Sequence, residues 1–283
     1  MKTSLFDLYK VGIGPSSSHT MGPMRAARTF LLELQARDLL AATVEVHVDL
    51  YGSLALTGSG HGTDRAVILG LLGEEASRID PDKIDSKLEA IQLSSTIALL
   101  GGHRVPFRQE QHIAFHRNQM IPPGARTQHP NGIRFTASDV TSNTLFTATY
   151  FSIGGGFIVE DGADIHSTPM MTTTSLPYPF HSAAELLEMA TRDNLRIHEL
   201  MMCNECARRG GTPEAAESVR RDILHIWDVM QSCVVRGLAT DGILPGGLRV
   251  RRRAKRLAAR LQQQAAAGKG TGDPLAPLDW VTI

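Results

Sequence analysis

Residues 12–20 are the part of this 283-residue sequence whose side chains are best suited to bind a small anion. The segment reads GIGPSSSHT and directly precedes an amphipathic helical pattern. Its glycines and proline favour a tight turn, after which three hydroxyls and the free N–H groups of the helix can hold a carboxylate or phosphate. The alternative is a helix cap that is rich in serine because serine caps helices. Composition alone does not separate the two interpretations.

His61 is a second candidate, because it stands between glycines in the segment GSGHGTD at residues 58–64. Glycines leave an imidazole accessible and let a ligand approach the backbone closely. Near neutral pH an imidazole can take up or release a proton, so it can act as a general base or acid. Asp64 is expected to orient this imidazole or to cap the following helix. The competing interpretation is a flexible loop with an incidental surface histidine.

Glycines and cysteines provide two weaker signals. Residues 154–156 are three glycines between two apparent strands, which indicates a bulge, a tight turn, or a close approach to a ligand or neighbouring domain. Cys203 and Cys206 have CxxC spacing, but a zinc site needs about four ligands and no second CxxC follows. Cys233 lies on the apolar stripe of a long helical pattern, where we expect it in the core. We assign no metal ligand.

The elements that must position these residues predict an α+β fold, which begins with a mixed α/β domain over residues 1–160. Alternating apolar and polar residues predict a strand with one wet face at 44–50. Further β-rich runs are broken by proline and glycine: 133–137, 144–152 and 157–160. Helical spacing predicts three helices packed around the sheet: 23–40, 66–72 and 81–93. Pro23 suits the first turn of the first helix, and Asp80 suits the N-cap of the third.

A change of pattern after residue 160 indicates a second unit. Residues 161–181 are polar and rich in proline and threonine, which predicts a linker. Residues 182–283 are then predicted to be the start of an all-α, incomplete helical domain, within which 261–278 is expected to be flexible.

Two helices of this second unit have recognisable ends. Ser182 and Glu185 have the spacing of a capping box. Thr212 and Pro213 predict the start of a longer helix, which Gly237 is expected to terminate.

Composition excludes several classes of protein. The sequence is 42% apolar, and its 29 Lys+Arg balance 29 Asp+Glu, so it is neither a disordered chain nor a globally basic nucleic-acid binder. Three cysteines do not make a secreted disulfide framework, and no stretch reaches the ~18 apolar residues of a membrane span. Asp7 interrupts the region where a signal peptide has its apolar run, which predicts a cytoplasmic protein.

Taken together, these segments resemble the bacterial iron–sulfur L-serine dehydratases, the single-chain L-serine ammonia-lyases. The matching segments of the first domain are SLFDLYKVGIGPSSSHTMGPMRAA, LYGSLALTGSGHGTDRAVILGL, HPNG at 129–132 and YFSIGGGFIVE at 150–160. WDVM at 227–230 and GILPGGLRVRRRA at 242–254 are similar to the opening of the family's helical domain.

The resemblance implies an α,β-elimination of L-serine to pyruvate and ammonia, as in amino-acid catabolism and gluconeogenesis. It implies a [4Fe–4S] cluster that acts as a Lewis acid on the substrate hydroxyl. His61 matches the family's proposed base, and His19 belongs to its substrate-facing loop, so the resemblance gives both histidines catalytic roles. It assigns L-serine binding to six further residues: Ser16, Ser17, Ser18, Thr20, Thr63 and Asp64.

The family's cluster cysteines lie in the second half of its helical domain, beyond Ile283. Cys203, Cys206 and Cys233 lack a recognised iron–sulfur spacing, so they are not expected to replace those ligands. We therefore expect the cluster cysteines on a second subunit or on further chain, and we expect a homo-oligomer.

Two other functions fit part of the pattern. The first domain resembles regulatory serine-binding domains of other enzymes, which would make this a non-catalytic L-serine sensor. A pyridoxal-phosphate lyase needs a Schiff-base lysine. The one candidate is Lys10, which lies beside residues 12–20, the segment that we call the serine loop.

Overall fold

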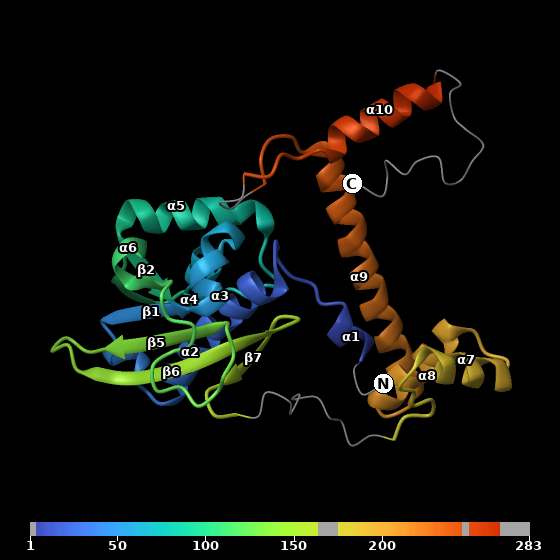
Figure 1. The fold of residues 1–283 in the computed structure, drawn as a ribbon, viewed down its shortest axis with the longest axis horizontal. Coiled ribbons are helices and arrows are strands. Elements are labelled where there is room, and N and C mark those ends of the chain that lie inside the picture. Colours follow the sequence, from blue (N-terminus) through green and yellow to red (C-terminus); the bar gives the residue numbers. More distant parts are fainter. Residues whose placement is uncertain (1–3, 164–174, 245–248, 267–283) are drawn as a thin grey trace.

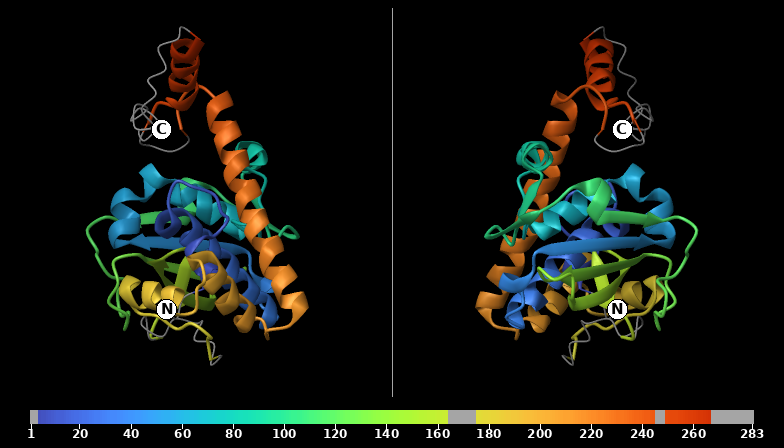
Figure 2. Two further views of the ribbon diagram at one scale, coloured as in Figure 1. Left: turned by 90° about the vertical axis from the view of Figure 1, so that its right-hand side faces the viewer. Right: turned by 90° about the vertical axis from the view of Figure 1, so that its left-hand side faces the viewer.

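The computed structural model describes residues 4–163, 175–244 and 249–266, and it confirms the predicted α+β fold. A sheet with packed helices comes first in the chain, and helices follow from residue 183 onward (Figure 1). The long helix α9, Pro213–Ala239, runs alongside the sheet part in both side views (Figure 2). No described helix has the length and apolar character needed to cross a membrane.

A five-stranded mixed sheet forms the centre of the first part. Its order is β4-β1-β5-β6-β7, with β1 parallel to β4 and all other neighbours antiparallel. The strands are β1 Glu45–Tyr51, β4 Ile113–His116, β5 Gly132–Ser138, β6 Thr144–Gly154 and β7 Phe157–Glu160. A separate hairpin pairs β2, Thr96–Leu99, with β3, His103–Pro106. The predicted alternation is confirmed within β1, because Val46, Val48 and Leu50 are buried while His47 and Asp49 between them are half-buried. Val44, which the prediction included, is exposed and lies before the strand.

The first part also contains helices, of which α2 and α4 pack on the sheet, and further helices form the second part. Those of the first part are α1 Leu5–Leu8, α2 Gly22–Ala36, α3 Gly52–Thr57, α4 Thr63–Leu71, α5 Ile84–Ser94 and α6 Gln109–His112. Shorter helical turns lie at Ser17–Met21, Leu40–Ala42, Gly58–His61 and Pro81–Lys83. Those of the second part are α7 Ala183–Arg192, α8 Ile197–Arg208, α9 and α10 Ala254–Ala266. Pro23 lies in the first turn of α2, and the Asp80 carboxylate accepts the Asp82 N–H, as predicted.

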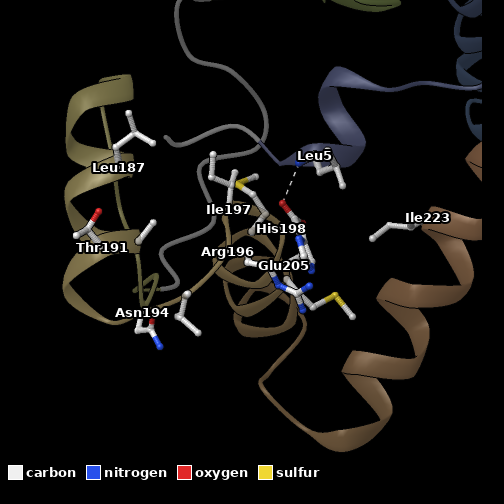
Figure 3. Close-up of a pocket in the computed structure, with 13 residues that line it drawn as sticks. Leu5, Leu187, Thr191, Asn194, Arg196, Ile197, His198, Glu205 and Ile223 are labelled. Carbon is white, nitrogen blue, oxygen red and sulfur yellow. Dashed lines mark hydrogen bonds between the residues drawn. The ribbon is translucent and has the colours of Figure 1, made fainter.

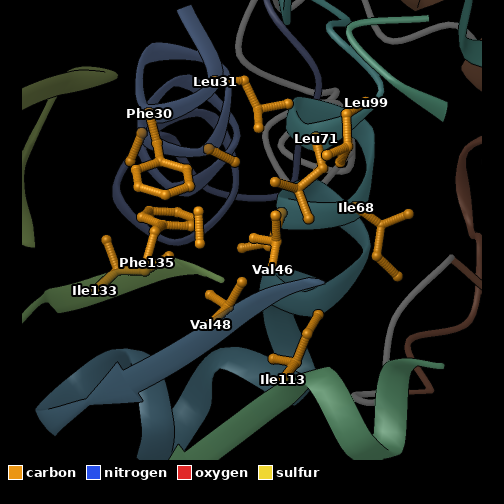
Figure 4. Close-up of a cluster of buried hydrophobic side chains, with 14 of the residues drawn as sticks. Phe30, Leu31, Val46, Val48, Ile68, Leu71, Leu99, Ile113, Ile133 and Phe135 are labelled. Atoms are coloured by element: carbon orange, nitrogen blue, oxygen red, sulfur yellow. The ribbon is translucent and has the colours of Figure 1, made fainter. Parts of the chain in front are cut away.

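The hydrophobic core lies between the sheet and helices α2 and α4 (Figure 4). Phe30 of α2 stacks on Phe135 of β5, with ring centroids 5.2 Å apart. Ile68 and Leu71 of α4 pack beside them, together with Val46. Burial of these apolar side chains is the main term that holds α2 and α4 on the sheet.

Truncation of Phe135 to alanine is expected to lower the free energy of unfolding by about 3–5 kcal/mol, because it removes a fully buried ring and leaves a cavity beneath Phe30. Urea unfolding followed by circular dichroism measures this loss. Val140→Ala is the control, since Val140 is 82% exposed in the turn after β5. Equal midpoints for the two variants would contradict this account of the core.

The three glycines at 154–156 form the tight turn between β6 and β7. All three have positive φ values, and the ladder is irregular between Ser152 and Gly154, so the expected bulge and turn are both present. Arg25 of α2 donates to the carbonyl of Gly156 at 3.2 Å. This bond fastens the turn to the helix that follows the serine loop.

Three predictions about the second part differ from the structure in detail. Helix α9 runs through Gly237 and ends at Ala239, because Gly237 has no left-handed φ and a glycine inside a helix costs only about 1 kcal/mol. Helix α10 includes residues 261–266, which we expected to be flexible; residues 267–278 lie outside the described residues.

The third of these predictions is the capping box at the start of α7. Ser182 Oγ accepts the Glu185 N–H at 3.2 Å, as a cap should. The Glu185 carboxylate, however, accepts the N–H of His181 at 2.7 Å, one residue before the cap.

Contacts of the first described residues tie the two parts together. Ser4 Oγ and the Leu5 N–H donate to the Glu205 carboxylate of α8 at 2.7 and 2.8 Å. Glu205 is only 2% exposed, and the Arg209 guanidinium lies 4.7 Å from the ring centroid of Phe6. A buried carboxylate is stable only when it is well hydrogen-bonded, so the N-terminal segment is specifically fixed to α8.

Candidate functional site

The serine loop before α2 combines a helix cap with accessible hydroxyls. Ser16 is the N-cap, since its Oγ accepts the His19 N–H at 3.2 Å and its own N–H donates to Thr20 Oγ1 at 3.3 Å. Ser18 is half-buried with its Oγ 3.3 Å from Ser16 Oγ, and Ser17 is exposed. The capping interpretation is therefore correct for Ser16, while Ser17 is exposed and the Ser18 hydroxyl contacts Ser16 and His19.

His19 is held by hydroxyl groups on both of its ring nitrogens. Nδ1 lies 2.9 Å from Ser18 Oγ, and Nε2 lies 2.9 Å from Ser53 Oγ at the start of α3. Thr63 Oγ1 donates to the carbonyl of His19, which fixes the backbone as well. Burial lowers the pKa of His19 below 6.5, and the nearby His61 lowers it further, although a hydrogen bond with the Ser53 backbone acts in the opposite direction. His19 is therefore a neutral, rigidly held ring near neutral pH.

His61 lies beside His19, with ring centroids 5.0 Å apart and planes tilted by 43°. His61 Nδ1 is 2.9 Å from the carbonyl oxygen of Thr57. Because a carbonyl can only accept, Nδ1 carries the hydrogen and Nε2 keeps a lone pair that can accept a proton. Thr20 Oγ1 donates to the His61 carbonyl at 3.0 Å. This hydrogen bond joins the serine loop directly to the helical turn Gly58–His61.

The low pKa of His19 gives a testable pH dependence. In the folded protein His19 binds its proton at lower pH than in the unfolded chain, so its contribution disfavours folding as pH falls below about 6.5. NMR titration of the imidazole protons should place the His19 midpoint below 6.5. His61→Gln removes a nearby titrating ring and should raise that midpoint; an unchanged midpoint would contradict the arrangement of the two rings.

Thr63 and Asp64 were expected to bind substrate, and in the structure both side chains are hydrogen-bonded to other residues of the chain. Thr63 is fully buried, and its hydroxyl is used by the His19 carbonyl. Asp64 Oδ2 accepts from the Gln109 amide at 2.8 Å, whereas the Thr57 carbonyl is the group that orients His61. Substrate binding by these two residues stays a prediction.

Ser53 and Thr57 contact the two candidate histidines, and the sequence patterns did not reveal them. The glycines around their segment predict a turn, but the segment forms α3, which supplies Ser53 Oγ to His19 and the Thr57 carbonyl to His61. The available signal was the spacing of four between Ser53, Thr57 and His61, which places residues on one face of a helix.

A hollow of about 470 Å³ opens next to His61. Its walls come from both parts of the chain: Gly14, Thr20, His61 and Arg65 from the first, and Cys233, Arg236 and Arg252 from the second. Arg65 pairs with Asp85, and Arg236 pairs with Asp82, so the acids at the rim are neutralised. The hollow is large enough for a small amino acid, and its second wall is α9.

Cys233 in this wall corrects our expectation of a core cysteine. It is exposed, because the apolar stripe of α9 beyond Val219 has no described partner that buries it. Cys203 is exposed and Cys206 is half-buried, both on α8. Among the described residues no group of three or more His, Cys, Asp or Glu side chains could hold a metal ion. The residues that the structure describes therefore do not fit a [4Fe–4S] cluster.

Lys10, the candidate for a Schiff base, lies away from the two histidines. Its ammonium is 4.3 Å from the ring centroid of Phe157 and 3.5 Å from the Asp7 carboxylate.

Comparisons with known proteins identify the family of this chain. The family described as serine dehydratase beta chain matches residues 4–163. The chain is 42% identical over 284 residues to an L-serine dehydratase of Streptomyces coelicolor, which covers 100% of this chain and 59% of that protein. It is 42% identical over 281 residues to the L-serine dehydratase TdcG of Escherichia coli, and 38% identical over 281 residues to an L-serine dehydratase of Haemophilus influenzae. In both cases the match covers 99% of this chain and 58% of the relative.

The chain thus spans somewhat more than half the length of these relatives. Since the family match covers more than half of its residues, this chain belongs to the serine dehydratase family, with residues 4–163 as its beta-chain unit.

Proposed function

We propose that this chain supplies the base and the carboxylate-binding loop of an L-serine ammonia-lyase, which converts L-serine to pyruvate and ammonia. The observation that carries the proposal is the contact between the two candidate segments. His61 presents a basic nitrogen next to a neutral His19 and directly beside the hydroxyl-rich loop. The names of the three relatives described above support the same reaction.

The proposed mechanism begins with the substrate carboxylate on the serine loop. Ser17 and Ser18 hold it through hydroxyl and backbone N–H groups, so that the Cα–H bond faces His61 Nε2. His61 takes the proton, and the electrons of the C–H bond form the Cα=Cβ double bond. The β-hydroxyl leaves with the electron pair of the C–O bond and takes up a proton to become water. The resulting aminoacrylate tautomerises to an imine, and water converts the imine to pyruvate and ammonia.

His19 helps this step by staying neutral. Two imidazolium rings 5.0 Å apart would repel each other, so a charged His19 would oppose protonation of His61. The low pKa of His19 prevents that conflict near neutral pH. The Thr57 carbonyl accepts the Nδ1 hydrogen of His61 throughout, and it stabilises the ring once Nε2 is protonated.

The cluster that the family resemblance implies has to be held elsewhere, since the described residues do not fit it. We propose that its cysteines belong to the portion of the relatives with no counterpart here, carried by a second subunit or by further chain. We derive no step of the mechanism through the cluster. We also propose a cytoplasmic homo-oligomer.

Calorimetry and a coupled pyruvate assay test the proposal together. The chain should bind L-serine on its own, and it should release pyruvate after anaerobic iron–sulfur reconstitution in the presence of the missing portion. Pyruvate release with near-stoichiometric iron from the chain alone would overturn the need for further polypeptide. Binding without turnover, even with that portion added, would favour the L-serine sensor. Absence of binding would overturn both functions.

A further inference from the structure

The helical part contains a large apolar hollow far from the two histidines. It has a volume of about 1020 Å³ and lies between α1, α7, α8 and the first half of α9 (Figure 3). Its apolar lining includes Leu5, Leu187, Leu195, Ile197, Met201 and Ile223. Leu187 and Ile197 are 55% and 48% exposed, so the hollow opens to the surface.

An exposed apolar stripe continues from this hollow along α9. We define the α9 face as Ile223, Trp227, Met230 and Val234, whose spacing of 4, 3 and 4 places them on one side of the helix. These side chains are 37%, 54%, 41% and 60% exposed. Only Ala215 and Val219, near the start of α9, are buried among its described residues. A continuous apolar surface of this extent marks an interaction site in a folded protein.

The chemistry of this surface favours a permanent partner over a transient one. Permanent interfaces are strongly apolar and resemble a domain core cut in half, whereas transient interfaces are about as polar as the rest of the surface. Side chains at i, i+4, i+7 and i+11 also form the ridge along which a second helix packs. The occupant that fits is therefore a helical polypeptide that stays bound.

The comparisons show that the relatives carry further polypeptide. The relatives match this chain from end to end, yet 41–42% of each has no counterpart in it (100 − 59 and 100 − 58). We propose that the hollow and the α9 face are the docking surface for that portion of a serine dehydratase, which packs as helices alongside α9. This inference rests on the proposed function, because it names the partner of that same site.

Docking along α9 has a consequence for the reaction. Ile223, in the first half of α9, lines the large hollow, and Cys233 and Arg236, in its second half, line the hollow beside His61. A polypeptide that lies along the α9 face is thereby brought to the rim of the His61 site. One helix would then both hold the partner and form a wall of the site that the partner completes.

Co-expression with a defined partner tests the proposal. The portion of the Streptomyces coelicolor L-serine dehydratase that has no counterpart here is expressed as a separate untagged polypeptide, with the tagged full chain as bait. We expect a stable complex by affinity purification and light scattering. Trp227→Glu and Ile223→Glu should each reduce the retained partner by more than about tenfold, since an unpaired carboxylate is not tolerated in an apolar interface.

Leu93→Glu is the matched control, because Leu93 is 80% exposed on α5 and outside the α9 face. The Leu93→Glu chain should retain as much partner as the wild-type chain does. Urea unfolding of all three variants checks that exposed positions were changed without loss of the fold.

Tryptophan fluorescence provides an independent readout, since the chain has only two tryptophans. In a Trp280→Phe background, Trp227 emission should shift to shorter wavelength when the partner is present, as the indole leaves water. No shift in a purified complex would overturn the proposed location.

The other outcomes are equally decisive. Failure of the wild-type chain to retain the partner, or equal retention by Trp227→Glu, overturns the proposal. A dimer of the chain alone that Trp227→Glu dissociates would show that a second copy covers the face. A stable complex that releases no pyruvate would leave the docking surface in place and overturn the proposed function instead.

Discussion

Replacement of His61 by glutamine is expected to lower kcat for L-serine by about 10²–10⁴-fold in the complete enzyme, with little change in KM. Glutamine keeps a hydrogen-bonding side chain of similar length but cannot accept the Cα proton. The carboxylate loop is untouched, because Thr20 bonds to the backbone carbonyl of residue 61, not to its side chain. Steady-state kinetics and exchange of the substrate Cα proton with deuterated water measure the loss.

His47→Gln is the control for this prediction. His47 is also partly exposed, but it lies on β1 beside Asp49 and outside the site. We expect its kcat to stay close to that of the wild type. A His61→Gln enzyme that still exchanges the Cα proton at the normal rate would show that another group is the base.

Gly52→Ala is expected to destabilise the first part by about 2–5 kcal/mol, the largest effect that we predict for adding one methyl group. A Cβ atom at this position would lie 2.2 Å from the carbonyl oxygen of Pro130 and 2.5 Å from that of Met120. Both are backbone atoms, which cannot rotate away. Gly52 also has a φ of 55°, a value that a residue with a Cβ adopts only with strain.

The same substitution should disturb the site, because Gly52 begins α3. Its neighbour Ser53 holds His19, and Thr57 at the end of α3 holds His61. Urea unfolding should therefore show a lower free energy of unfolding, and calorimetry should show weaker binding of L-serine.

Gly237→Ala is the matched control for the added methyl group. Gly237 lies inside α9 without a positive φ, and a Cβ atom added there would meet no heavy atom within 4 Å among the described residues. Alanine should therefore stabilise the helix by about 0.5–1 kcal/mol. A Gly52→Ala protein as stable as wild type would contradict the close approach of the Met120 and Pro130 carbonyls to Gly52.

Much of the first part could be predicted from local patterns. The strand β1 and the helix α2 follow from alternation and helical spacing, because each pattern reports a face that must be buried. Helix α3 could not be predicted in this way, since it is six residues long and its flanking glycines suggest a turn. Tertiary contacts stabilise it: the Gly52 and Ser53 N–H groups donate to the carbonyls of Gln119 and Pro130.

Cys233 shows the opposite failure of a local pattern. Its place on an apolar stripe correctly predicted an amphipathic helix, but amphipathicity says only that one face avoids water. Which partner covers that face depends on a surface that the helix itself does not encode. The described residues bury only the first turns of α9, so Cys233 is exposed.

The sequence by itself determined the kinds of groups available to this protein: a hydroxyl-rich helix start and a histidine between glycines, each set by local backbone preferences. Only the tertiary structure decided that His19 and His61 stand 5.0 Å apart, which nitrogen of His61 can accept a proton, and that α3 orients both rings. The physical reason is that distances between segments about 40 residues apart depend on how α2, α3 and α4 pack on the sheet. That packing is a collective result of buried surface, which no single motif contains.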